Sequence, residues 1–198
     1  MIEVTSFFES GEQMMKHPVA SIYTDHGVIK VELFPEYAPN AVSGFLWAVR
    51  EKIYENRVIR RVVPGFVLQP SYSYFEEKRC DFMIEGEFAA NGVDNPLKME
   101  KGTVAMAGDG AKLAHGCEFF ITLSDEAGEK LQDRFTAFGK VISGYEEVER
   151  LEQVETVQLF PEGVQAIIRQ PVEDEHMLRV EVETFGEVYP DPVVARWC

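Results

Sequence analysis

The sequence predicts a mainly β fold, a barrel or sandwich whose ends are capped by two helices. Seven or eight short stretches have the apolar and alternating composition of strands, and only two stretches carry apolar residues at helical spacing. No segment rich in Pro, Gly or Ser divides the 198-residue chain. A chain of this length can bury one substantial core without disulfides, so we expect a single domain.

The first predicted elements are a hairpin and a helix. Residues 21–34 alternate with period two on both sides of Asp25-His26-Gly27, a sequence typical of a tight turn. Residues 39–54 then place apolar side chains at helical spacing. Pro39 suits the start of this helix, and Asn40 is close enough to cap it.

The rest of the chain predicts further short strands and one more helix. We expect strands over 58–69 (interrupted at Pro64-Gly65), 82–84, 103–107, 118–123, 136–141 and 177–185. The second helix is predicted over 145–154, with an acidic side. Residues 158–170 fit no predicted element and are expected to form an extra packed segment or a contact surface.

Charge and cysteine content narrow the possible function. The chain has 19 Lys and Arg against 34 Asp and Glu, a formal net charge of −15, which would repel a nucleic-acid backbone. Three widely spaced cysteines do not form a disulfide framework and suit a reducing compartment. No stretch has the length of a membrane span or the pattern of a signal peptide, so we expect a cytoplasmic protein.

Motifs for cofactor, metal or covalent chemistry are missing from the sequence. There is no phosphate-binding loop, dinucleotide fingerprint, zinc-protease motif or nucleophile elbow. His115-Gly116-Cys117 is the one close His/Cys pair, too few groups for a zinc site. We therefore expect no metal, no organic cofactor and no covalent intermediate.

One apolar strand stretch contains an arginine pair. Arg60 and Arg61 interrupt this stretch, and Phe66 and Gln69 follow at near-alternate positions. In a barrel, this pattern would place a guanidinium beside an aromatic pocket.

The same stretch, residues 59–69, resembles the signature of the cyclophilin family. Three further segments match motifs of that family in the right order, residues 102–107, 116–121 and 138–141. The resemblance implies a closed eight-stranded antiparallel barrel with two capping helices, and it implies cis–trans isomerisation of Xaa-Pro bonds. It divides the chain into an extension at 1–20 and a domain at 21–198, with an insertion around 155–175 and a tail around 187–198.

This reaction needs neither a proton nor a covalent intermediate. Resonance gives rotation of the amide bond a barrier of ~18–20 kcal/mol. A catalyst must bind the twisted amide better than either planar isomer, and a fixed donor near the amide does this. Arginine is suited to the task because it stays charged and presents its donors in a rigid fork.

The resemblance assigns roles to ten residues of this sequence. Arg61 is the expected catalytic guanidinium, and Gln69 would orient it or bind the peptide. Ala107 and Gly108 would pair with the substrate backbone. The remaining substrate-binding positions are Phe66, Val67, Glu118, Phe120, Leu131 and Phe135.

This sequence departs from the family pattern inside the expected pocket. His, Gly, Asn, Gln and His of the family are replaced here by Arg60, Pro70, Gly108, Glu118 and Phe135, respectively. A carboxylate only accepts hydrogen bonds, so Glu118 could hold Arg61 away from the substrate, or Arg60 could neutralise it. We expect reduced turnover. Lys130 falls near an aromatic position of the family, so we also expect weak cyclosporin binding.

The sequence therefore predicts a prolyl isomerase that acts on proline-containing peptides or unfolded chains. The alternative is a proline-peptide binding module or chaperone of the same fold with weak or no isomerase activity. A scaffold that offers its acidic C-terminal part to a basic partner rests on charge alone.

Overall fold

The computed structural model describes residues 16–70, 78–160, 162 and 166–197. Most of the predicted extension at 1–20 lies outside the described residues. The sheet nevertheless begins within it, since the first strand, β1 (Val19–Thr24), starts at Val19.

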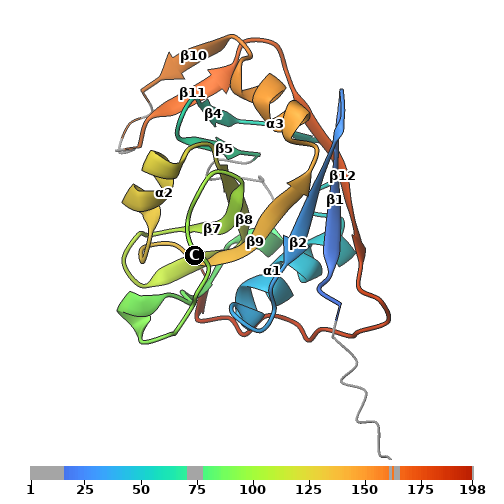
Figure 1. Ribbon diagram of the computed structural model, residues 1–198, viewed down its shortest axis with the longest axis vertical. Helices are drawn as coiled ribbons and strands as arrows, with labels where there is room; N and C mark the ends of the chain where they lie inside the picture. The colour runs from blue at the N-terminus through green and yellow to red at the C-terminus, as the bar shows by residue number, and fades with distance from the viewer. Residues whose placement is uncertain (1–15, 71–77, 161, 163–165, 198) are drawn as a thin grey trace, which may run out of the picture.

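One curled sheet of antiparallel strand pairs forms the body of the molecule (Figure 1). It contains β1, β2 (Val28–Leu33), β3 (Arg57–Val58), β4 (Arg61–Val63), β5 (Val67–Gln69), β6 (Phe82–Glu85), β7 (Thr103–Gly108), β8 (Leu113–Thr122), β9 (Ala137–Ser143), β12 (His176–Glu183) and β13 (Arg196–Trp197). The order is β13-β6-β8-β7-β9-β2-β1-β12-β3, and β5 joins β4 to β8. These pairings form an open path between the described strands, so closure into an eight-stranded barrel stays a prediction.

Most predicted strands are confirmed, with shifted ends. The hairpin pairs Ser21 with Lys30 and turns at Asp25-His26-Gly27, where Thr24 N–H donates to the Gly27 carbonyl at 2.9 Å. The predicted break at Pro64-Gly65 separates β4 from β5. β8 begins five residues before the predicted strand, because it continues past the site to pair with β6.

Within the described part of the chain, three α-helices accompany the sheet, one more than predicted. They are α1 (Pro39–Arg50), α2 (Asp125–Leu131) and α3 (Tyr145–Glu152), with short 3-10 turns at Lys78–Cys80 and Ala89–Asn91. The missed helix α2 has a local signal: Ser124 Oγ accepts from Ala127 N–H at 3.1 Å, and two acidic residues occupy its first turn.

The predicted cap of α1 is wrong. Ala38 is the N-cap residue, and the Asn40 side chain instead contacts the backbone of Val193. The carboxylate of Glu87 accepts from the N–H groups of Asn40 and Ala41 at 2.9 and 2.8 Å. A carboxylate from a distant loop therefore satisfies the first turn, which local sequence does not reveal.

The core lies between the sheet and α1. Phe45 of α1 contacts the rings of Tyr54, Phe119 and Phe138 at centroid distances of 5.3, 5.4 and 5.5 Å. α1 approaches β8 so closely that a Cβ on Gly44 would lie 2.3 Å from the Gly116 carbonyl oxygen. This contact fixes the path of β8, which carries several residues of the site.

The segment without a predicted element forms a second, two-stranded sheet. Its strands are β10 (Thr156–Leu159) and β11 (Ile168–Pro171), and Val172 N–H donates to the Glu155 carbonyl at 2.9 Å where the hairpin leaves the body. β11 packs against β4, and Figure 1 shows the hairpin above β4 and β5.

The C-terminal segment lies along α1 and ends at the sheet edge. Arg50 pairs with Asp191, Ala195 N–H donates to the Met83 carbonyl at 2.9 Å, and β13 pairs with β6. Among the described residues, no helix has the length and apolar character needed to cross a bilayer.

Candidate active site

A cavity of about 630 Å³ opens where β4, β5, β7, β8 and α2 meet. This volume lies within the ~300–1,000 Å³ typical of ligand pockets. All ten residues predicted for the site line it: Arg61, Phe66, Val67, Gln69, Ala107, Gly108, Glu118, Phe120, Leu131 and Phe135. The structure therefore brings the predicted set together, while the role of each member stays a prediction.

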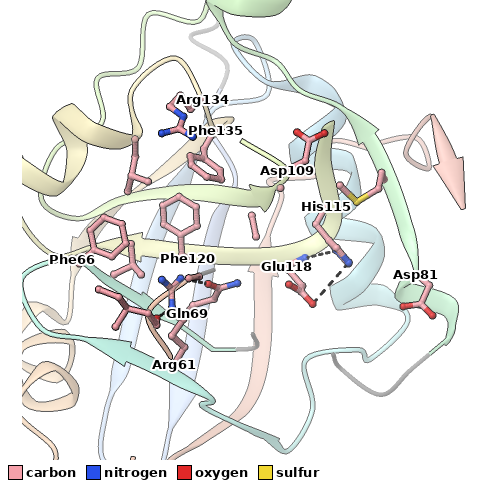
Figure 2. A pocket seen from close by; sticks show the side chains of 17 residues that line it. Arg61, Phe66, Gln69, Asp81, Asp109, His115, Glu118, Phe120, Arg134 and Phe135 are labelled. Carbon is pink, nitrogen blue, oxygen red and sulfur yellow. Dashed lines mark hydrogen bonds and ion pairs between the residues drawn. The ribbon is translucent and has the colours of Figure 1, made fainter. Parts of the chain in front are cut away.

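The β4–β5 hairpin positions Arg61. Gly65 adopts a φ of 69° in the connecting turn, and the resulting register places Arg61 directly opposite Gln69. Arg61 Nη1 donates to Gln69 Oε1 at 2.9 Å, and Arg61 Nε donates to the Ile167 carbonyl at 2.9 Å. With only 8% of the residue exposed, the guanidinium is held in one orientation at the cavity wall (Figure 2).

Aromatic and aliphatic side chains form the other wall. Phe120 and Phe135 meet edge to face at 5.5 Å and 87°. Phe120 belongs to a small core cluster with Val67 and Leu131, and the partly buried Phe135 packs against it. Arg61 Cζ lies 5.8 Å from the centroid of the Phe66 ring. A cation thus borders an apolar space that suits a small ring such as proline.

His115 and Glu118 also line the cavity, on the side away from Phe66 (Figure 2). His115 Nδ1 accepts from the N–H groups of Cys117 and Glu118 at 3.3 and 3.2 Å, so a neutral ring carries its proton on Nε2. Burial lowers the pKa of His115 to about 4, with a weak opposing effect from Asp81. His115 is therefore neutral near pH 7, and its Nε2 lies 3.9 Å from Glu118 Oε1.

Glu118 is only 4% exposed and projects from β8 into the cavity. Figure 2 shows it on the His115 side, while Arg61 and Gln69 lie together below Phe120. The alternatives in which Glu118 pairs with Arg61 or is neutralised by Arg60 both stay predictions.

The backbone geometry explains why residue 108 is a glycine. The β7–β8 pairing is irregular between Met106 and Gly108, and a Cβ at Gly108 would lie 2.3 Å from the Leu113 carbonyl oxygen. Asp109 holds the following turn by accepting from the N–H groups of residues 111, 112 and 113, each at 2.9 Å. An asparagine at this position would therefore not fit the turn as it stands.

Sequence reasoning missed seven residues of the cavity wall, namely Asp81, Met83, Asp109, His115, Arg134, Ala166 and Ile167. His115 and Asp109 lie close to predicted site residues in sequence, so their proximity was a usable signal. Ala166 and Ile167 come from the segment that fitted no predicted element, and only tertiary packing places them beside Arg61.

The His, Cys, Asp and Glu side chains that the structure describes do not form a metal site. Across the described ranges, no three His, Cys, Asp or Glu side chains gather as metal ligands. Cys80 and Cys117 are buried free thiols, and hydrogen bonding to Cys80 together with burial raises the pKa of Cys117 well above its usual range. Cys198 lies outside the described residues.

Comparison with known proteins identifies the family. The family model described as cyclophilin type peptidyl-prolyl cis-trans isomerase matches residues 19–182. The chain belongs to this family. The matched residues, 19–182, include every strand and every residue that lines the cavity described above. The sequence resemblance to cyclophilins is thereby confirmed.

Individual cyclophilins support the assignment. The chain is 31% identical over 144 residues to peptidyl-prolyl cis-trans isomerase B of Escherichia coli (strain K12), covering 70% of this chain and 86% of that protein. It is 30% identical to peptidyl-prolyl cis-trans isomerase A of Dickeya dadantii (strain 3937), covering 70% and 73%.

The fold is also shared with solved cyclophilins. A cyclophilin type isomerase of Cryptosporidium parvum superimposes with a TM-score of 0.67 at 22% identity, covering 84% of this chain and 98% of that chain. A second structure of that protein was solved in the presence of the dipeptide Ala-Pro and gives a TM-score of 0.65.

Proposed function

We propose that this cyclophilin catalyses cis–trans isomerisation of Xaa-Pro bonds in proline-containing peptides and unfolded chains. One observation carries the proposal: a buried arginine, fixed by Gln69 and by the Ile167 carbonyl, borders an apolar cavity of suitable size. Family membership supports the same reaction.

The geometry suggests how the rate increases. Phe66, Phe120 and Phe135 would hold the proline ring while the peptide on its other side rotates. Twisting the amide restores a lone pair on the proline nitrogen and removes resonance. Arg61 can donate to the twisted amide without reorganising, because its guanidinium is already held in place.

The decisive experiment measures isomerisation of an Ala-Pro tetrapeptide by wild type and by Arg61→Ala. We expect wild type to accelerate the reaction and Arg61→Ala to lose about 10²–10³-fold in kcat/KM, as for removal of a preorganised donor. Arg79→Ala is the matched control, because Arg79 is an exposed arginine that pairs with Glu51 outside the cavity. Equal rates for wild type and Arg61→Ala would contradict the assignment of Arg61.

A second candidate is a proline-peptide binding module with little turnover. The buried carboxylate of Glu118 favours it, because the family has an amide at this position. A folded wild type that binds the tetrapeptide without accelerating its isomerisation would support this candidate over the first.

The proposal includes weak cyclosporin binding, because Lys130 occupies a position near an aromatic residue of the family. A titration that gives nanomolar affinity would contradict it.

Cytoplasmic location, the lack of a nucleic-acid partner and closure of the sheet into an eight-stranded barrel remain expectations from the sequence.

A further inference from the structure

The β10–β11 hairpin is an added element that stands beside the cavity. It forms a sheet of its own, packs on β4 through β11, and begins and ends at the hydrogen-bonded pair Glu155 and Val172. β4 is the strand that carries Arg61. The position of β11 therefore affects the position of β4, the strand that carries the expected catalytic group.

Ile167, just before β11, contacts that group directly. Its backbone carbonyl accepts from Arg61 Nε at 2.9 Å, while Gln69 accepts from Nη1. Two acceptors on different elements constrain a planar guanidinium more than one would, because rotation about the side chain breaks at least one bond.

The side chain of Ile167 is available to a ligand. Ala166 and Ile167 line the same cavity as Arg61 and Phe66, and 54% of Ile167 is exposed. Phe160, which follows β10 at the same end of the ladder, is 86% exposed. Large apolar side chains left open beside a binding cavity indicate contact with apolar groups of a ligand.

We propose that Ile167 is a specificity-determining residue of the isomerase site and that the chain at Ile167, just before β11, forms one wall of its substrate groove. The Ile167 side chain contacts an apolar residue directly flanking the substrate proline, while its carbonyl positions Arg61. This inference rests on the proposed function and adds the substrate class, peptides with a large apolar residue beside proline.

The test compares peptides that differ only beside the proline. Wild type, Ile167→Ala and Val157→Ala are assayed on tetrapeptides containing Ala-Pro-Ala, Leu-Pro-Ala or Ala-Pro-Leu. Val157 is the matched control because it is a half-exposed β-branched residue of the same hairpin that does not line the cavity. We expect Ile167→Ala to lower kcat/KM about three- to tenfold on a leucine peptide and less than twofold on Ala-Pro-Ala. Val157→Ala should change neither.

The outcomes separate this inference from the proposed function. The leucine-to-alanine ratio is kcat/KM on a leucine peptide divided by kcat/KM on Ala-Pro-Ala. If wild type is active on all peptides and this ratio is the same in Ile167→Ala, the inference is overturned and the function stays intact. If wild type shows no turnover, the same ratio is measured on peptide dissociation constants. Loss of leucine preference in Ile167→Ala would then support the inference, and an unchanged ratio would overturn it.

The positioning contact has its own spectroscopic readout. In wild type, the Arg61 Nε–H should give a dispersed, slowly exchanging NMR signal, assigned by its loss in Arg61→Lys.

Replacing residues 156–171 by a two-residue turn joins Glu155 to Val172, which already lie within hydrogen-bond distance. In this variant we expect fast exchange of Nε–H and a lower kcat on every peptide. An unchanged signal would contradict positioning by Ile167. If the shortened chain does not fold, the leucine-to-alanine ratio of Ile167→Ala decides the proposal.

Discussion

At the residue scale, the polar side chains of the cavity form two sets of contacts. Arg61 lies with Gln69 and the Ile167 carbonyl, whereas Glu118 lies with His115 (Figure 2). Both Arg61 and Glu118 are nearly buried, at 8% and 4% exposure. Charges in so little solvent interact more strongly than surface charges, so the identity of residue 118 should matter for turnover.

Glu118→Gln tests that consequence. Restoring an amide removes the carboxylate from the cavity that Arg61 also lines and adds a donor, so we expect kcat/KM on the Ala-Pro tetrapeptide to rise about two- to tenfold. Glu85→Gln is the control, because Glu85 is an exposed glutamate that does not line the cavity. A rate that stays the same or falls in Glu118→Gln would show that the carboxylate does not limit turnover.

His115 predicts a pH dependence of stability. Burial lowers its pKa from 6.5 to about 4, so between these values the unfolded chain binds more protons than the folded one. Titration of His115 therefore leaves the free energy of unfolding unchanged above about pH 7.5. It lowers this free energy as the pH falls from about 7 to 4. The effect is on the order of 3 kcal/mol.

Urea unfolding at pH 7.5, 6, 5 and 4.5 measures this effect. We expect wild type to lose more stability over this pH range than His115→Gln, because the glutamine at position 115 does not titrate. Parallel curves for the two proteins would contradict the assigned pKa.

At the element scale, α3 is fixed by an ionic cluster rather than by its own apolar residues alone. Arg150 donates to Glu147 at 2.8 Å and to Glu175 at 2.6 Å, and Thr24 Oγ1 donates to Glu147 at 2.6 Å. Burial raises the pKa of Glu147, but the bonds from Arg150 and Thr24 outweigh it, so the net pKa is lowered. The cluster joins α3 to β1 and to the segment before β12.

Arg150→Ala should be strongly destabilising. It leaves two carboxylates, Glu147 at 4% and Glu175 at 9% exposure, without their shared partner. We expect a loss of about 2–3 kcal/mol, below the ~3–5 kcal/mol of a fully buried pair, because the Arg150 side chain is 33% exposed. Chemical denaturation at pH 7 measures it, and Arg179→Ala, which breaks an exposed pair with Glu181, should cost much less, because solvent screens surface pairs. Equal losses would contradict the special role of Arg150.

At the scale of the whole molecule, the C-terminal segment covers part of the core. Trp197 packs against Phe82 at 5.5 Å, and Val194 packs against the main core cluster. Because β13 pairs with the edge strand β6, the segment also shields an open sheet edge.

Removing residues 189–198 tests this covering role. We expect a loss of about 1–3 kcal/mol, which for a chain of this size lowers the Tm by about 2–12 °C. Calorimetry or thermal circular dichroism measures it, with Val188→Ala as the control because Val188 is 92% exposed. An unchanged Tm would show that the segment adds no stability.

Local sequence reasoning succeeded where the pattern is short-range. The β1–β2 hairpin and the break at Pro64-Gly65 follow from alternation and turn residues, so both were predictable. α2 was missed because seven residues are too few for a clear helical period, although Ser124 signalled its start. β10 and β11 were missed because each has only four residues, too few to establish an alternating pattern.

The sequence by itself determined the family, the mainly β composition and ten of the residues that line the cavity, because ordered motifs along the chain carry that information. Only the tertiary structure decided which groups touch them. The Ile167 carbonyl reaches Arg61 across 106 positions, and Glu87 caps α1 from 46 and 47 positions away. Such contacts depend on how the sheet curls and which loops it brings together, and no local pattern encodes that.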